Sequence, residues 1–283
     1  MTAQQYLILA LQASVALTVL GLGLTASWRD ATYLLRQPGL LVRSILAMSI
    51  VMPIVAVAIA HLFAFPVEVE IALVAVAIAP VPPLLYKKQL GAGGRREYVV
   101  GLLAAMGLLS IVLVPVSVAI LSRLYAADVM VSPLVIAKII LTSVLAPLAL
   151  GLLIRQWFPA AEKASSHIIA LAGLLLVVGA VMLLYGLWPV IRTFLGNGVA
   201  LMLAVFVVIG LCVGHLLGGP VPADRTTLAI STAQRHPAVA LAIASATGTA
   251  MQSAAAVIVM YLIIATIVIV PYQKWRARVT PTQ

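Results

Sequence analysis

The sequence contains very little charge. Of its 283 residues only 8% are Asp, Glu, Lys or Arg, whereas 64% are hydrophobic and the mean hydropathy is +1.20. This composition excludes a soluble globular domain and is typical of a chain that crosses a lipid bilayer many times. We therefore expect an all-α polytopic membrane protein with one integral membrane domain over residues 1–283.

Cysteine is almost absent, because Cys212 is the only one in the chain. An intrachain disulfide and a multi-cysteine metal site are therefore excluded. The histidines His61, His167 and His215 have no metal-ligand spacing among them, and the sequence shows no nucleophile and base pair. We expect no metal site, no cofactor and no enzymatic activity.

Acidic residues are scarce, and none lies in the middle of an apolar segment. The seven Asp and Glu residues all fall in expected loops or at the ends of expected spans: Asp30, Glu68, Glu70, Glu97, Asp128, Glu162 and Asp224. Membrane carriers that use protons often rely on an intramembrane Asp or Glu, and a transported Na⁺ needs hard oxygen ligands that usually include a carboxylate. This absence argues against sodium coupling.

Nine apolar segments account for most of the chain. Each has about the 20 residues that a hydrocarbon core requires. Their approximate limits are 5–26, 39–63, 67–90, 97–122, 130–156, 165–186, 194–218, 224–247 and 250–272. The first segment lacks a basic region before its apolar run, so we interpret it as an uncleaved span and not a signal peptide.

The basic residues indicate the orientation of the chain in the membrane. With the N-terminus outside, only Arg123 and Arg192 of the 17 Lys and Arg residues fall in outer loops, while Lys138 and Arg235 lie within spans. All the others fall at or near the cytoplasm: Arg29, Arg36, Arg43, Lys87, Lys88, Arg95, Arg96, Arg155, Lys163, Arg225, Lys274, Arg276 and Arg278. This positive-inside bias predicts an inner-membrane protein with the N-terminus out and the C-terminus in, and it explains the net charge without a nucleic-acid partner.

Two of the nine segments contain residues that a continuous helix does not tolerate. The third has Pro80, Pro82 and Pro83 near its middle, and the eighth has Arg235 immediately before His236 and Pro237. Proline removes a backbone donor and clashes with the preceding turn, so both helices should break there. Irregular backbone at membrane depth is tolerated only against protein or a water-filled cavity. A helix from Glu68 to Pro80 climbs about 18 Å, and one from Arg225 to His236 climbs about 16 Å from the other side, so the breaks should meet.

The sequence also carries a weak internal repeat. Pro66 precedes the third segment as Pro222 precedes the eighth, and Trp28 with Gly39 brackets a polar loop much as Trp188 with Gly198 does. The offset of about 156 residues encloses an odd number of spans, which is the pattern of an inverted repeat in a secondary transporter. We expect repeat one over about 5–122 and repeat two over about 130–272. Chance similarity between low-diversity apolar segments is the alternative.

The residues beside the breaks have two interpretations each. Arg235 suits the counter-ion of an anionic substrate, since its planar fork matches carboxylate, sulfonate or phosphate; alternatively it caps carbonyls that the proline breaks leave free. Gln234 and His236 could orient a ligand or relay a proton; alternatively, each only satisfies hydrogen bonds of its neighbours. Lys87 either lines the cavity or only contributes to the positive-inside charge. The remaining candidate lining residues are Tyr86, Ser231 and Thr232.

Three blocks of the sequence resemble the bile acid:sodium symporter family, within the superfamily that also contains arsenite and auxin carriers. They are GLTASWRDATYLLRQPGLL, MPIVAVAIAHLFAFPVEVEIALVAVAIAP and PADRTTLAISTAQRHPAVALAIA. The resemblance runs from about Gly21 to Trp275. It implies two crossing broken helices in a core domain, a separate panel domain, and an elevator-like or rocking motion between them.

The sodium-site motifs of that family are not retained. The family has Pro-Gly-Gly-Thr-x-Ser-Asn at the first break, where this chain reads Pro-Val-Pro-Pro-Leu-Leu-Tyr from Pro80 to Tyr86. A gapless alignment places Ser231 at the Glu of the second motif and Arg235-His236 at its Gln-Asn. The resemblance therefore implies that Arg235 holds its charge about where relatives hold a sodium ion.

These observations predict a secondary carrier for a small organic anion that is not driven by sodium. The alternatives are a sodium-coupled symporter that uses carbonyl and hydroxyl ligands, and a non-transporting membrane receptor for an anion. The expected partners are the substrate and the lipid bilayer, and the sequence is compatible with a homo-oligomer. It does not define the substrate, the coupling ion or the direction of transport.

Overall fold

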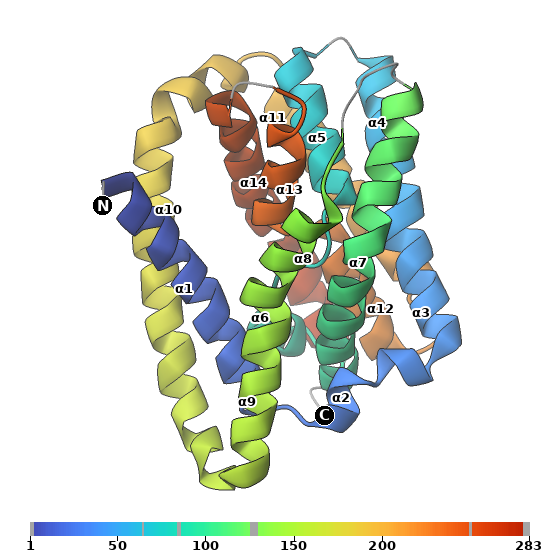
Figure 1. Ribbon diagram of the computed structural model, residues 1–283. Coiled ribbons are helices and arrows are strands. Elements are labelled where there is room, and N and C mark those ends of the chain that lie inside the picture. Colours follow the sequence, from blue (N-terminus) through green and yellow to red (C-terminus); the bar gives the residue numbers. More distant parts are fainter. Residues whose placement is uncertain (1–2, 64, 84–85, 125–129, 249–250, 280–283) are drawn as a thin grey trace.

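The computed structural model describes residues 3–63, 65–83, 86–124, 130–248 and 251–279, and within these ranges all regular structure is helical (Figure 1). The first part of the chain, up to residue 124, contains α1 (Ala3–Gly23), α2 (Trp28–Ala31), η1 (Leu34–Arg36), α3 (Pro38–Ile45), η2 (Leu46–Val51), α4 (Met52–Leu62), α5 (Val67–Ile78), α6 (Tyr86–Gly91) and α7 (Arg96–Leu124). They are followed by α8 (Pro133–Ile140), η4 (Leu141–Leu145), α9 (Ala146–Trp157), η5 (Pro159–Ala164), α10 (Ser165–Leu195), α11 (Val199–Leu217), α12 (Pro222–Ala233), α13 (Pro237–Ser245) and α14 (Met251–Val279).

Six helical stretches in the described residues are long and apolar enough to cross a membrane unaided. They are Pro38–Leu62, Arg96–Arg123, Pro133–Trp157, Pro159–Leu195, Val199–Leu217 and Met251–Val279. A further apolar stretch, Leu9–Gly23, belongs to α1. The prediction of an all-helical, multi-pass membrane protein is confirmed.

The remaining two expected segments are each divided into two short helices. The third becomes α5 and α6, and the eighth becomes α12 and α13. Neither half is long enough to span a bilayer, which requires about 20 residues. The predicted interruption of these two segments is therefore present in the structure.

The predicted loop between the sixth and seventh segments is wrong. The sequence placed a connection at about 187–193, with Trp188 as a loop residue, but α10 continues without interruption through Pro189 to Leu195. Proline is tolerated in long membrane helices because neighbouring groups can satisfy the freed carbonyl. The last helix, α14, likewise continues through Pro271 to Val279, beyond the expected limit near residue 272.

Two of the long helices contain a π-helical segment just before a proline. In η2 the segment precedes Pro53, and in η4 it precedes Pro147. A proline has no N–H for the carbonyl four residues earlier, which belongs to Ser49 in the first case and Ser143 in the second. The helix widens locally at such a point, and π segments of this kind are frequent at functional sites.

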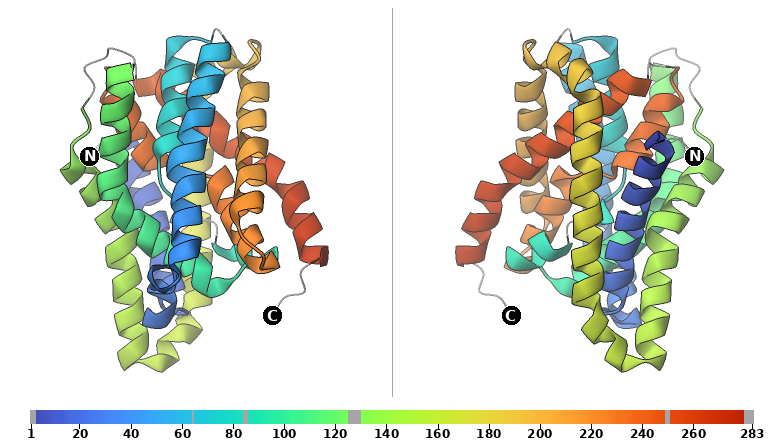
Figure 2. Two further views of the ribbon diagram at one scale, coloured as in Figure 1. Left: turned by 90° about the vertical axis from the view of Figure 1, so that its right-hand side faces the viewer. Right: turned by 90° about the vertical axis from the view of Figure 1, so that its left-hand side faces the viewer.

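The helices form two groups. α1 packs along α10 and against α9, while α5, α11, α12, α13 and α14 pack on one another around the two helix breaks (Figures 1 and 2). Glycines allow the closest approach in the second group: a Cβ added at Gly214 of α11 would lie 2.5 Å from the Cα of Ala229, and one at Gly210 would lie 3.0 Å from the Cα of Ala233. These two glycines therefore fix α12 against α11 over the turns that lead to the second break.

Candidate functional site

Each break begins where the backbone leaves the helical conformation. α5 ends at Ile78, and Ala79 is extended with φ −61° and ψ 145°. α12 ends at Ala233, and Gln234 is extended with φ −129° and ψ 147°. Pro237 occupies the first turn of α13, a position that suits proline because the missing N–H would have no helical partner there.

The two breaks bond directly to each other. The backbone N–H of His236 donates to the carbonyl oxygen of Pro80 at 2.8 Å, and the Nη1 of Arg235 donates to the carbonyl oxygen of Ala79 at 3.3 Å. Carbonyls at the end of a helix have no partner within it and need donors from elsewhere. The capping role considered for Arg235 is thus present in the structure, and it involves one edge of the guanidinium.

The other edge of the Arg235 guanidinium has no partner among the described residues. The residue is only 2% exposed, yet its Nε and Nη2 make no hydrogen bond. These two nitrogens carry parallel N–H groups that lie in the guanidinium plane and point from the same edge, which is the geometry of a bidentate contact with an acceptor. The two ion pairs found in the described part of the chain, Arg95–Asp224 and Arg155–Glu162, lie elsewhere.

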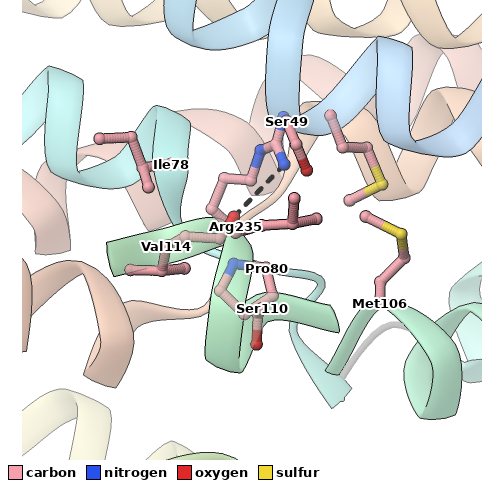
Figure 3. A pocket seen from close by; sticks show the side chains of 10 residues that line it. Ser49, Ile78, Pro80, Met106, Ser110, Val114 and Arg235 are labelled. Atoms are coloured by element: carbon pink, nitrogen blue, oxygen red, sulfur yellow. Dashed lines mark hydrogen bonds between the residues drawn. The ribbon is translucent and has the colours of Figure 1, made fainter. Parts of the chain in front are cut away.

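The Arg235 guanidinium lines a small cavity of about 10 Å³ (Figure 3). Its walls come from η2, the first break and α7, and they are Met48, Ser49, Ile78, Ala79, Pro80, Met106, Ser110, Leu113 and Val114. A volume of this size accommodates about one water-sized group. In this conformation the cavity is therefore too small for an organic anion beyond a single small group.

His236 faces away from this cavity. Its Nε2 lies 3.2 Å from the Oγ of Ser143, in the π-helical segment η4, and its Nδ1 has no hydrogen-bond partner among the described residues. Consecutive side chains of an extended backbone point to opposite sides. Arg235 and His236 therefore contact two different long helices, one through η2 and the other through η4.

The remaining candidates of the second break are buried: Ser231 and Thr232 lie in the turn before it, and Gln234 is its first residue. Ser231 accepts a hydrogen bond of 2.7 Å from the Nε2 of Gln89 in α6, which is a third hydrogen bond between the two broken segments. The Thr232 hydroxyl has no partner among the described residues, and Gln234 is 5% exposed. All three residues belong to the same buried crossing.

The two candidates from α6 lie apart from Arg235. The Tyr86 hydroxyl accepts from the Nε of Arg96 at 3.1 Å and lies 3.5 Å from the Oγ1 of Thr25. Lys87 is exposed. In this conformation neither side chain lines the cavity beside Arg235. Pro82 and Pro83 follow the end of α5, and both are buried.

Sequence reasoning did not identify several residues that the structure brings to the crossing. They are Ser49, Gln89, Ser110, Ser143 and Tyr261, of which the last donates to the carbonyl oxygen of Ala233 at 2.8 Å. One available signal was a serine four residues before a proline within an apolar segment, which occurs in both SIVMP and SVLAP. That spacing frees the carbonyl of the serine and widens the helix at the serine.

These features define a class: a multi-pass helical membrane protein with two broken helices bonded to each other inside the molecule. The model of the sodium bile acid symporter family matches residues 13–190, which is more than half of the chain. The chain belongs to this family. Membership makes it a secondary transporter and not an enzyme. The match includes the first break and stops before the second, and a comparison with curated proteins found no match.

Proposed function

We propose that the protein carries a small organic anion across the membrane and binds the anion's charged group at the crossing of the two breaks. Family membership supports the transport function, and Arg235 supports the charge of the substrate. A buried guanidinium with a free bidentate edge and no carboxylate partner in the described residues is the observation on which the proposal rests. An isolated buried charge is costly, and a bound anion would offset that cost.

The proposal includes nine membrane spans. The six long helical stretches, α1, and the broken pairs α5–α6 and α12–α13 together make up this number. Cationic segments gather at one end of the molecule: Arg155 donates to the carbonyl of Thr25, Arg95 contacts Tyr33 and pairs with Asp224, and Arg276 donates to the carbonyl of Pro222. The C-terminal end of α14 and α2 lie at this same end (Figures 1 and 2). We assign it to the cytoplasm because of the positive-inside rule.

An inverted repeat is also part of the proposal, and the helix lengths support it. α5 and α12 both have 12 residues, and α7 and α14 both have 29. Within the longer pair, Pro115 and Pro271 are about 156 residues apart, which is the offset between Pro66 and Pro222. A chance similarity between apolar segments would not require equal helix lengths.

We infer that the two packing groups correspond to two moving bodies. The group of α1, α9 and α10 would serve as the panel, and the group around the breaks would serve as the core. His236 and Ser143 form a contact between the crossing and the long helix that ends in α9, so this hydrogen bond would break and reform as the bodies move. The size of the cavity beside Arg235 requires such a motion before an organic substrate can enter.

Transport is proposed to proceed without sodium. The Ala79 and Pro80 carbonyl oxygens, which are hard ligands at the first break, already accept hydrogen bonds from the second break. A sodium-coupled mechanism with carbonyl and hydroxyl ligands would need these contacts to open. At about 4 Å, two like charges repel by about 4 kcal/mol at the effective dielectric constant of a protein site.

The test is an uptake assay with purified protein in liposomes and a panel of labelled organic anions, each with and without a sodium gradient. The proposal expects uptake of at least one organic monoanion, with the same rate in sodium and in choline. Uptake of cations or neutral solutes only would contradict the anion assignment. A requirement for sodium would favour the symporter with carbonyl and hydroxyl ligands.

A further inference from the structure

The cavity beside Arg235 has the properties of an anion site in its own right. Both nitrogens of the free guanidinium edge are fully enclosed and lack a partner among the described residues, and the Arg235 side chain lines the cavity wall. Figure 3 shows the guanidinium next to Ser49, with Ile78 and Pro80 of the first break on the other side. The cavity therefore contains a concentrated positive charge with two directed donors.

The hydroxyl groups in the wall add one further donor. The Ser110 hydroxyl donates to the carbonyl oxygen of Gly107 at 2.6 Å, so its proton is already used. The Ser49 hydroxyl makes no hydrogen bond to any described residue and is available. Ser49 lies in the π-helical segment η2, four residues before Pro53, where the helix has widened.

The remaining wall is apolar and restricts the size of the occupant. Met48, Met106, Leu113 and Val114 surround the donors, and the volume of about 10 Å³ is that of about one water-sized group. A phosphate or sulfate is larger and doubly charged, and within the described residues Arg235 is the single cation of this wall. Size, charge and donor count together favour a monoatomic monovalent anion.

We propose that the cavity binds a chloride ion, held by Nε and Nη2 of Arg235 and by the hydroxyl of Ser49. The ion is the counter-ion of Arg235 while the crossing is closed, and the anionic group of an organic substrate replaces it when the cavity opens. The inference goes beyond the proposed transport function, although the two share Arg235. Chloride binding is expected whether or not the protein transports an organic anion.

The experiment measures chloride binding to detergent-purified full-length protein by isothermal titration and by the thermal midpoint. Choline chloride is titrated into choline sulfate at constant ionic strength, so that only the anion changes and the reference anion is one that the cavity excludes by size and charge. A ligand that binds only the folded state raises the midpoint by an amount that grows with the logarithm of its concentration above the dissociation constant. The isothermal titration saturates and gives the half-saturating chloride concentration. We expect saturation in the wild type, and a half-saturating chloride concentration at least threefold higher in Ser49→Ala.

Arg235→Gln should abolish the saturable response, whereas Arg192→Gln should leave it unchanged. Arg192 is the matched control because the same substitution removes an exposed charge from α10. Absence of a saturable chloride response in the wild type, or its retention in folded Arg235→Gln, overturns the inference. If Arg235→Gln does not fold, an unchanged half-saturating concentration in Ser49→Ala overturns it instead.

The outcomes also separate the inference from the proposed function. Saturable chloride binding together with no uptake of any organic anion supports the inference and contradicts the proposed function. Organic-anion uptake that depends on Arg235, in a protein that shows no chloride binding, supports the proposed function and contradicts the chloride inference. Competition is expected where both hold: a transported organic anion should raise the half-saturating chloride concentration linearly with the concentration of that organic anion.

Discussion

The backbone N–H of His236 donates a 2.8 Å hydrogen bond to the carbonyl oxygen of Pro80, which joins the two helix breaks through their main chains. Each break supplies what the other lacks, because proline leaves carbonyls without donors and extended residues leave donors without carbonyls. The side chain of Arg235 adds a second bond between the breaks, to the carbonyl oxygen of Ala79. The crossing is therefore a single hydrogen-bonded unit, and a change in one break affects the position of the other.

The packing of α12 against α11 should be sensitive to a single methyl group. A Cβ at Gly214 meets the backbone of Ala229, which cannot move as a side-chain end can. Gly214→Ala should lower the free energy of unfolding by about 1–3 kcal/mol, as overpacking in a core does. Thermal unfolding of detergent-purified protein measures this. Gly173→Ala in α10 is the control, since nothing lies within 4 Å of its added Cβ. Equal midpoints for the two variants would contradict the close approach.

The contact between His236 and Ser143 should contribute to the closed conformation. Ser143→Ala removes the partner of Nε2, and the loss of one buried hydrogen bond costs about 0.5–1.5 kcal/mol. We expect a lower thermal midpoint and a changed uptake rate. Thr142→Ala is the matched control in the same π-helical segment, because the Thr142 hydroxyl bonds only to carbonyls of its own helix. A Ser143→Ala variant that behaves as Thr142→Ala does would show that the contact is unimportant.

Substrate uptake should not depend on sodium. The Arg235 charge lies at the crossing, where the carbonyl oxygens of Ala79 and Pro80 already accept hydrogen bonds from the second break. Replacing external sodium with choline should leave the initial rate of uptake in liposomes within the error of the assay. A steep sodium dependence would contradict this prediction. It would mean that the carbonyl oxygens of the first break release their hydrogen bonds to Arg235 and His236 and bind a sodium ion instead.

The orientation in the membrane should follow the basic residues. Single cysteines introduced into a Cys212→Ser background should react with an impermeant reagent at Glu68 from outside. Cysteines at Arg95 and at Arg278 should react only after the membrane is opened, because both positions belong to the cationic end. Labelling of the Arg278 and Glu68 positions from the same side would contradict the odd number of spans that the proposal places between these two residues.

Much of the fold was predictable because it depends on local chemistry. Proline dictates where a helix cannot continue, so Pro80 and Pro237 placed both breaks within a few residues of their observed positions. The apolar pattern misplaced the end of α10 near residue 186, because the helix continues through Trp188 and Pro189, which is tolerated inside a long membrane helix. Local pattern thus identifies the breaks but does not decide which membrane proline ends its helix.

The partners at the site were less predictable because they come from distant parts of the chain. Ser143 is 93 residues from His236, and Gln89 is 142 residues from Ser231, so no periodicity links them. The alternation of an extended backbone predicts that Arg235 and His236 diverge, but only the packing shows which helix each one meets. Lys87 illustrates the converse, since closeness to a break in sequence did not bring its side chain to the cavity.

The most direct test of the account is anion binding to Arg235 variants of the purified protein, with thermal stability measured in parallel. Arg235→Lys keeps the charge but loses the bidentate edge, so it should weaken binding of the transported anion by about tenfold, or about 1.4 kcal/mol. Arg235→Gln should remain folded, because glutamine can still donate to the Ala79 carbonyl, and should show no measurable binding. A folded Arg235→Gln protein that binds the anion as the wild type does would show that Arg235 only caps the broken helix, and the account would be wrong.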